Sequence, residues 1–385
     1  MRRVAVLSTG LTKVDKQWRK SIKELYGDAA RLAIKDVKIP QIDALIVGNM
    51  CASDLSDQNN IGALIADYIG IAPSTAYRIE AACGSGGAAV LGAYLAVASG
   101  MYDFVMTGGV EKLTDGVGGN TTHSLGKAAD AEFELFYGSS FVSLNAMLMN
   151  HYMHHYHISR EDFADFAVLM HKNGSRNPYA QLPFPITRET VINSDMISDP
   201  ISLYDCAPVG DGAASLILCP LEDAPKYSDS YVEITGIAGA TDTINLSSRE
   251  DLLTLKSTVS AAEKAYKMAK VSPRDIDVAE IHDTFTITGV LSLEDLGFCE
   301  KGKFHKTLAN GGFEPGGSIS INPSGGLKSR GHPVGATGAY QVAEIAMQLT
   351  NKADKWQIPD AEIGLAQNIG GSGSSTYVTI LRRSR

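Results

Sequence analysis

The sequence predicts an α/β fold made of two duplicated halves, with a third segment inserted between them. Three observations support this: an internal repeat, an alternation of strand and helix patterns in each half, and a polar stretch that interrupts the alternation. The composition agrees, because 44% hydrophobic and 20% charged residues in 385 are ordinary for a globular protein. A chain of this length can bury a large core without disulfides or structural metal.

The repeat appears when Ala29 to Asn49 (AARLAIKDVKIPQIDALIVGN) is compared with Ala261 to Asp283 (AAEKAYKMAKVSPRDIDVAEIHD). Both segments open with an Ala-Ala helix and continue through a Pro-containing turn and an Ile-Asp pair into a short apolar strand. Small-residue helices then begin at Cys83 in one half and at His332 in the other. Matches that recur in the same order indicate a duplication.

Each half ends its pattern with a strand that runs into glycines, FVMTGGV at 104–110 and GLAQNIGG at 364–371. The alternation of strands and helices predicts mostly parallel sheets flanked by helices. We expect one half at 1–115 with 205–228 and the other at 229–385. The segment 116–204 is polar, aromatic and Pro-containing, with a helix-like stretch at 160–174, and is predicted to be an inserted loop domain that covers a site.

Charge and cysteine usage exclude several classes of protein. The formal net charge of −9 argues against a nucleic-acid partner, which would need a basic face. No apolar stretch approaches the roughly 20 residues of a membrane helix, and the run Val4 to Leu7 is too short for a signal peptide. The five cysteines are odd in number and form no CxxC pair, which favours a reducing cytoplasm over a disulfide scaffold or a zinc site.

Cys83, in EAACGSGG, is the candidate nucleophile. The glycines after it allow a sharp turn and close approach of a ligand, and a helix N-terminus is expected to lower the pKa of a thiol. A buried apolar role is expected for the remaining cysteines. The same stretch fits a weak dinucleotide fingerprint at 84–89, but the strand before it, 75–79, is short and the expected acidic residue is misplaced.

Two histidines are candidate partners of this thiol. His332, in NPSGGLKSRGHPVGATGAY, lies where the internal symmetry would bring it across from Cys83, and it could take the thiol proton. His282, in EIHDTFTI, follows a strand, at the sheet edge where parallel sheets place ligand sites. The glycine run AQNIGGSGSS at 366–375 offers backbone N–H groups that could stabilise an oxyanion.

A histidine cluster, HYMHHYH at 151–157, places two of its rings on one helical face, as metal ligands might be. It lacks an HExxH pattern and a companion carboxylate. A solvated or packed helix is therefore expected there, and no metal site.

Together these motifs resemble the thiolase superfamily over essentially the full chain. The resemblance is carried by AACGSGG, the HDTF block, NPSGGLKSRGHPVGATG, NIGGSG, ISREDFADFAV and APVGDGAASLIL. The HD-x-F block resembles the archaeal and sterol-carrier-protein-linked branch. The resemblance implies a five-layered αβαβα fold, in which two sheets enclose buried helices and a loop domain holds CoA.

The activity implied is that of an acetyl-CoA C-acetyltransferase, which condenses two acetyl-CoA to acetoacetyl-CoA and CoA through acyl-Cys83, without a cofactor. His332 and His282 would form one oxyanion site, for the enolate. The N–H groups of Cys83 and Gly370 would form the other, with Asn368 and Phe285 also in the site. Further family expectations are a homodimer or dimer of dimers, a place at the head of the mevalonate pathway, and a complex with hydroxymethylglutaryl-CoA synthase through a small bridging protein.

Two departures from the family pattern matter. Many thiolases carry an acid/base cysteine where this chain has Asn368, and others carry it where this chain has Thr284. Neither residue can act as a thiol base, so the sequence suggests that His282 takes over transfer of the α-proton. A decarboxylating ketosynthase, which needs no such base, is the alternative. A catalytically silent scaffold is a third reading, which the intact Cys83 and His332 oppose.

Overall fold

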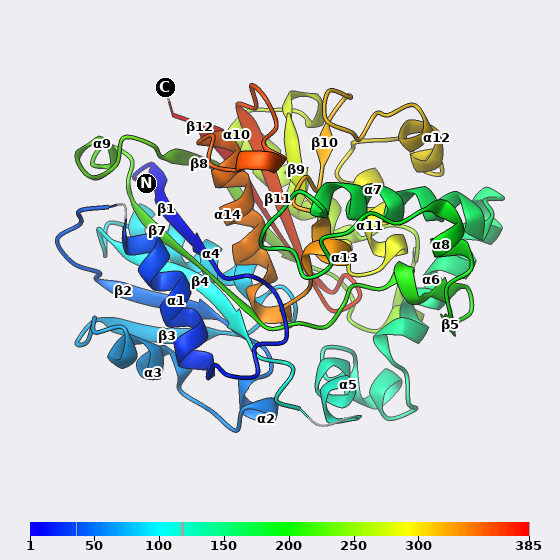
Figure 1. Cartoon of the computed structure of the whole chain (residues 1–385), viewed down its shortest axis with the longest axis horizontal. Helices are drawn as coiled ribbons and strands as arrows, with labels where there is room; N and C mark the ends of the chain where they lie inside the picture. Colours follow the sequence, from blue (N-terminus) through cyan, green and yellow to red (C-terminus); the bar gives the residue numbers. More distant parts are fainter. Residues whose placement is uncertain (36, 117–118, 385) are drawn as a thin grey trace.

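The computed structural model describes residues 1–35, 37–116 and 119–384 (Figure 1). The strands within these ranges are β1 (Val4–Leu11), β2 (Ala44–Gly48), β3 (Thr75–Ile79), β4 (Val105–Glu111), β5 (Met196–Ser198), β6 (Ile201–Ser202), β7 (Gly212–Pro220), β8 (Val232–Thr241), β9 (Val278–Glu280), β10 (Ser320–Ile321), β11 (Ile363–Gly370) and β12 (Ser375–Arg383). The α-helices are α1 (Ile22–Lys35), α2 (Ala52–Leu55), α3 (Ile61–Tyr68), α4 (Ser85–Ala98), α5 (Gly119–Gly126), α6 (Phe141–Tyr156), α7 (Ala164–Gly174), α8 (Arg188–Ile192), α9 (Ala224–Tyr227), α10 (Lys256–Ala269), α11 (Thr286–Asp295), α12 (Phe304–Ala309), α13 (Gly326–Arg330) and α14 (Thr337–Leu349).

The main sheet shows the duplication directly. Its strand order is β10-β9-β11-β12-β8-β1-β7-β4-β2-β3, so each half contributes five neighbouring strands in mirrored order. In each half the strand one in from the outer edge pairs in parallel with both of its neighbours, and the next two ladders are antiparallel. The predicted α/β fold with two related halves is confirmed.

The expectation of mostly parallel sheets is only half right, because half of the ladders within each half are antiparallel. The reason is local in the second half, where β11 and β12 are joined by the short turn 371–374 and must therefore run in opposite directions. In the first half the chain returns to the sheet as β7 only after the inserted segment, and it enters antiparallel to β4.

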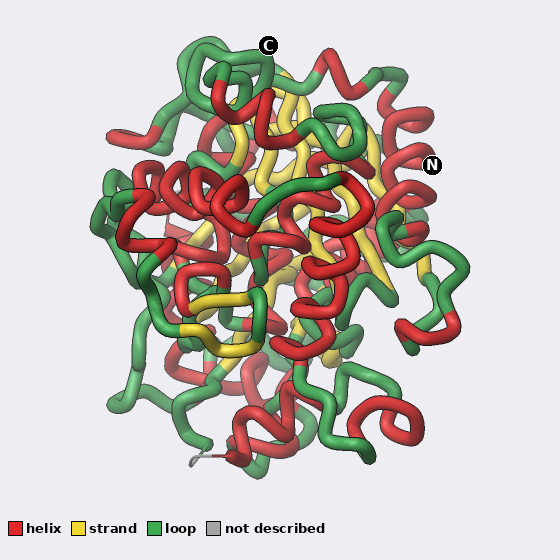
Figure 2. Tube along the Cα trace, turned by 90° about the vertical axis from the view of Figure 1, so that its right-hand side faces the viewer, coloured by secondary structure: helices red, strands yellow, loops and turns green. Residues whose placement is uncertain are grey.

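The five layers form because both halves of the sheet pack on the same two helices. Helices α4 and α14 contact each other; α4 packs on β4 and β2, and α14 packs on β11. Outside them, α1 covers β1 and β7, while α10 covers β8 and β12. Figure 2 shows the strands running through the interior with helices around them. The two halves of the main sheet are joined at one place, where 4–6 of β1 pair with 232–234 of β8.

Small residues make the central helix layer possible. Helix α4 (SGGAAVLGAYLAVA) is apolar or small on nearly every side, which is typical of a helix buried all round. A Cβ placed on Gly86 would lie 2.7 Å from the backbone nitrogen of Ala339 in α14. Only glycine allows the two helices to approach this closely, and their N-terminal ends are the parts that carry the candidate nucleophile and base.

The inserted segment lies on one side of this layered body and appears in green tones on the right of Figure 1. It holds α5 to α8 and the small sheet of β5 and β6. The helix-like stretch at 160–174 is a 3-10 turn followed by α7, which packs against α13. The domain boundaries drawn from the sequence stay a prediction. Within the described residues, no helix is both long and apolar enough to span a membrane.

Candidate active site

A cavity of about 210 Å³ lies between the central helices and the inserted segment. Cys83, His282, Phe285 and His332 all line it, so the structure brings together four side chains that the sequence analysis singled out. Its other walls are mainly apolar and include Leu113, Leu125, Phe141, Val142 and Val334. Such a cavity, with a few convergent polar groups, is typical of a small-molecule site.

Cys83 lies in a tight turn between β3 and α4. Ala82, just before it, has a left-handed φ of +54°, and the Gly84 N–H donates to the Ala81 carbonyl at 2.9 Å. Burial, and next the neighbouring Glu111, raise the pKa of the Cys83 thiol to about 12, although the N–H groups of Gly371 and of Cys83 itself act in the opposite direction. The expected lowering of this pKa by the helix N-terminus is therefore wrong for the free protein. Cys83 is a thiol, and it needs a base.

His332 has the lone pair that such a base requires. Its Nδ1 lies 2.8 Å from the Thr337 hydroxyl, which itself donates to the Pro333 carbonyl at 3.2 Å. Thr337 is thus an acceptor for His332, so Nδ1 carries the hydrogen and Nε2 is left with a lone pair. The buried Nε2 has no hydrogen-bond partner among the described residues. Burial, and then the proximity of His282 and Arg330, hold the His332 pKa well below its usual range, so the ring is neutral.

His282 differs because both of its ring nitrogens have partners. Nε2 lies 2.7 Å from the Thr284 hydroxyl, and Nδ1 lies 3.3 Å from the side-chain nitrogen of Asn368. Burial, and then Arg330, lower the pKa of His282 to about 3. The two histidine rings are 5.2 Å apart between centroids. The free lone pair on His332 favours that residue as the proton acceptor, in place of His282.

The glycine block at the end of β11 contacts the candidate nucleophile through Gly371, one position after the expected Gly370. The N–H near the Cys83 sulfur is that of Gly371, and Gly371, not Gly370, lines the cavity. Gly370 is still paired in the β11–β12 ladder, opposite Ser375. Gly371 is therefore the residue of this glycine block whose N–H faces the Cys83 sulfur. Nothing in the sequence distinguishes these two adjacent glycines.

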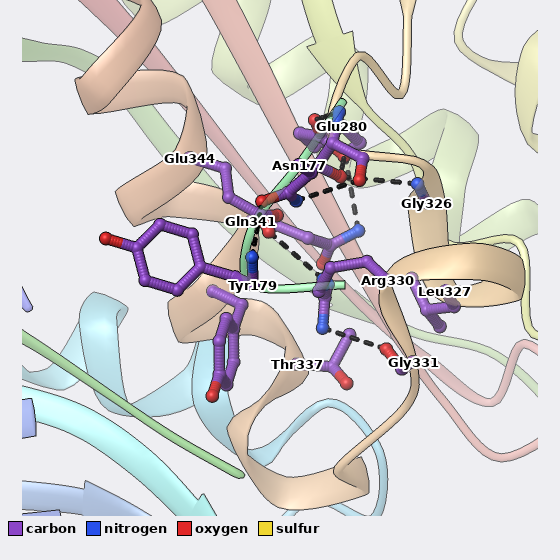
Figure 3. Close-up of polar contacts among 12 residues, drawn as sticks. Asn177, Tyr179, Glu280, Gly326, Leu327, Arg330, Gly331, Thr337, Gln341 and Glu344 are labelled. Atoms are coloured by element: carbon purple, nitrogen blue, oxygen red, sulfur yellow. Dashed lines mark hydrogen bonds and ion pairs between the residues drawn. The ribbon is translucent and has the colours of Figure 1, made fainter. Parts of the chain in front are cut away.

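A buried charge cluster behind the two histidines was missed by the sequence analysis. Arg330 is fully buried, and its Nε lies 3.1 Å from a carboxylate oxygen of Glu344 in α14 (Figure 3). Glu280, also fully buried, accepts from the N–H and hydroxyl of Ser324 at 3.0 and 2.7 Å. Glu280 and Arg330 each precede an active-site histidine by two residues. The cluster thus holds the segments that carry His282 and His332.

The charges of this cluster predict a pH-dependent stability. Burial raises the pKa of Glu344 to about 7 and raises the pKa of Glu280, and repulsion between the two carboxylates adds to the latter. Since these folded-state pKa values exceed those of the unfolded chain, stability should fall as pH rises from about 4.5 through 7. We expect the free energy of unfolding of Glu344→Gln to fall less between pH 5 and pH 8, by roughly 1–3 kcal/mol. Urea titrations at both pH values measure this.

The matched control is the exposed Glu263→Gln on α10. Its unfolding free energy should keep the slope of the unmodified chain with pH. An unchanged slope in Glu344→Gln would show that Glu344 does not bind the proton that makes stability depend on pH.

The described residues contain no group of three or more His, Cys, Asp or Glu side chains that could hold a metal ion. The histidine run at 151–157 lies in the last turns of α6 and the residue after it. His151 and His155 lie one turn apart there, with ring centroids separated by 6.2 Å.

Comparisons with known proteins cover the whole chain. Residues 4–222 match the family model for the thiolase N-terminal domain, and residues 238–383 match the thiolase C-terminal domain-like model. The chain is 45% identical over its full length to an acetyl-CoA acetyltransferase of Methanothermobacter thermautotrophicus, covering 100% of both chains. It is 30% identical to human sterol carrier protein 2, covering 99% of this chain and 72% of that protein.

Solved structures show the same arrangement. The Ltp2-ChsH2(DUF35) aldolase superposes with a TM-score of 0.87 at 25% identity, covering 100% of this chain and 98% of that one. An acetyl-CoA acetyltransferase from Syntrophomonas wolfei superposes with a TM-score of 0.79 at 16% identity over the full length of both chains. The second likeness shows the fold alone.

Proposed function

The chain belongs to the thiolase family, an acyltransferase family, and from this premise we propose that it condenses two molecules of acetyl-CoA into acetoacetyl-CoA and CoA. The observation that carries the proposal is the Cys83 thiol, which shares one small apolar cavity with His332, whose Nε2 has no partner among the described residues. The reaction needs no cofactor beyond the CoA thioesters themselves.

The first half-reaction acylates the enzyme. His332 Nε2 takes the proton of the Cys83 thiol while the sulfur attacks the thioester carbonyl of acetyl-CoA. The N–H groups of Cys83 and Gly371 stabilise the oxyanion of the tetrahedral intermediate. The C–S bond to CoA then breaks, and the leaving thiolate takes the proton from His332. The products are acetyl-Cys83 and CoA, and the imidazole is neutral again.

The second half-reaction forms the carbon–carbon bond. A second acetyl-CoA enters, and the neutral His332 removes a proton from its methyl group. Groups around His282 stabilise the enolate oxygen, and the enolate carbon attacks the carbonyl of acetyl-Cys83. Collapse of the intermediate releases acetoacetyl-CoA, and the Cys83 sulfur recovers a proton from His332. One residue thus supplies the base that a second cysteine supplies in many thiolases.

A second copy of the chain is the proposed partner at β3. This strand lies at the free edge of the main sheet, and its Tyr77 side chain is 42% exposed. An edge strand with exposed apolar side chains offers unpaired backbone groups to another strand. Sedimentation should show a dimer or a dimer of dimers, and a monomer at micromolar concentration would contradict this assembly.

The physiological setting we propose is the head of the mevalonate pathway in the cytoplasm. Formation of acetoacetyl-CoA is uphill, so an enzyme that consumes it at once, such as hydroxymethylglutaryl-CoA synthase, would draw the reaction forward. A bridging protein of the DUF35 type is supported by the structural neighbour Ltp2-ChsH2(DUF35). Pull-down of both partners by the tagged chain from its native source tests this.

The purified protein should be given three substrate sets in parallel: acetyl-CoA alone, acetoacetyl-CoA with CoA, and malonyl-CoA with acetyl-CoA. Turnover of the first two supports the proposed reaction. Turnover of the third set alone would identify a decarboxylating condensing enzyme, a reading favoured by Asn368 and Thr284 at the positions where thiolases carry their acid/base cysteine. Absence of turnover with all three substrate sets would indicate that the protein is a catalytically silent scaffold.

A further inference from the structure

The side chain of Asn368 is held in one orientation by two backbone groups from the opposite half of the molecule. The Gly87 N–H donates to its Oδ1 at 3.0 Å, and its Nδ2 donates to the Cys83 carbonyl at 3.0 Å. A flipped amide would set donor against donor and acceptor against acceptor, so the nitrogen and oxygen positions are determined. Asn368 is 2% exposed, which makes water an unsuitable substitute for either partner.

The packing around this amide is equally restrictive. A Cβ on Gly338 would lie 2.3 Å from Asn368 Oδ1, and one on Gly87 would lie 3.0 Å from the same atom. The two glycines, one at the start of each central helix, therefore leave just enough room for the amide. The side chain cannot rotate without displacing α4 or α14.

The second hydrogen on Asn368 Nδ2 is directed at His282 Nδ1, 3.3 Å away. Because Asn368 presents a donor, Nδ1 of His282 must be the acceptor and its hydrogen must be on Nε2. Nε2 then donates to the Thr284 hydroxyl at 2.7 Å. The Thr284 oxygen is an acceptor in that bond, so its own O–H stays available, and Thr284 lines the cavity.

We propose that Asn368 is a positioning residue that fixes the direction of this hydrogen-bond chain, from Asn368 through His282 to Thr284, so that the Thr284 O–H donates into the cavity and stabilises the enolate oxygen of the second acetyl-CoA. This rests on the proposed function and deepens it. This hydrogen-bond chain releases no proton and supplies only hydrogen bonds, while His332 removes the α-proton. Thr284 then donates a hydrogen bond at the position where other thiolases carry an acid/base cysteine.

The direction of the chain can be reversed by one substitution. In Asn368→Asp an ionised carboxylate, which only accepts, replaces the donor, so that His282 should carry its hydrogen on Nδ1 and accept from Thr284 at Nε2; the carbon-13 shift of the Asp carboxyl identifies the pH at which it is ionised, and the histidine spectrum is recorded there. The nitrogen-15 spectrum of histidine-labelled protein distinguishes the two forms of a neutral imidazole. We expect Nε2–H for His282 in the unmodified chain and Nδ1–H in Asn368→Asp, with the spectrum of His282→Asn identifying the signal. An Nε2–H form in Asn368→Asp would overturn the proposal.

The kinetic test uses Thr284→Val, which keeps both anchors of Asn368 and removes only the hydroxyl, and Thr284→Ser, which restores it. We expect Thr284→Val to lower condensation and exchange of the acetyl methyl protons with D2O by about 10²- to 10³-fold. Acetylation of Cys83, followed by mass spectrometry, should stay close to that of the unmodified chain. Thr284→Ser should recover most of the lost condensation.

The double variant Asn368→Asp/Thr284→Val should condense no more slowly than the slower single variant, because both changes break one chain. The proposal would be overturned if the fold losses in condensation rate of the two single variants multiplied in the double variant. It would also be overturned if Thr284→Val condensed acetyl-CoA as fast as Thr284→Ser. Failure of the proposed function has a different signature. The unmodified chain would then leave Cys83 unacetylated by acetyl-CoA, while the nitrogen-15 result would be unaffected.

Discussion

Cys83→Ala should lose condensation of acetyl-CoA by about 10⁴-fold or more, since no other group can form the acyl-enzyme. The loss should appear in both directions of the reaction, in condensation and in thiolysis of acetoacetyl-CoA. Intact-protein mass spectrometry after exposure to acetyl-CoA should show an acetyl adduct on the unmodified chain and none on the variant.

The matched control is Cys299→Ala. Cys299 is a half-buried cysteine that does not line the cavity. The Cys299→Ala variant should be acetylated on Cys83 and should condense acetyl-CoA at the rate of the unmodified chain. If the Cys83→Ala variant formed an acetyl adduct and still condensed acetyl-CoA, Cys83 could not be the nucleophile.

His332→Asn should lower the rate of Cys83 acetylation by about 10²- to 10⁴-fold, the contribution typical of a general base. Condensation should fall at least as far, because the same nitrogen is assigned to both proton transfers. Burial lowers the pKa of His332 and raises that of Cys83 to about 12, so a neutral imidazole and a thiol coexist across the neutral range. Acetylation by the unmodified chain should therefore change little between pH 6 and pH 9.

His154→Asn, on the exposed face of α6, is the control for the loss of a histidine. Its acetylation rate should equal that of the unmodified chain. If Cys83 were acetylated at full rate in His332→Asn but the variant did not condense acetyl-CoA, another residue would be the base for the thiol. If acetylation rose steeply with pH in the unmodified chain, a thiolate formed without a buried base would explain the chemistry better.

Much of the fold and the main site residues could be predicted from motifs. The repeat of helix, turn and strand predicted the matching positions of β2 and β9, and the two small-residue helices predicted the central layer of α4 and α14. The Gly-His-Pro block and the Cys-Gly-Ser-Gly turn carried enough pattern to place Cys83 and His332 in one site.

The parts that failed depend on long-range contacts. Whether a cysteine at a helix start is a thiol or a thiolate depends on how deeply it is buried, and no local pattern around Cys83 reports that depth. The role of His282 depends on which atom of Asn368 faces it, and that follows from the Gly87 N–H, 281 residues away in the chain. Arg330 and Glu344 looked like ordinary charged residues, because burial of an ion pair leaves no mark on composition.

The mirrored strand order of the two halves has a consequence for how such a site can arise. Cys83 and His332 lie in the segments that lead into the central helices of their own halves, Cys83 before α4 and His332 before α14. A symmetric pair of identical half-length chains would carry the same residues before both central helices, so the thiol and the imidazole could not be divided between the halves. In this chain the two halves carry different residues at these places, the thiol in one half and the imidazole in the other. The thiol–imidazole pair is therefore a product of broken symmetry between the two halves of the chain.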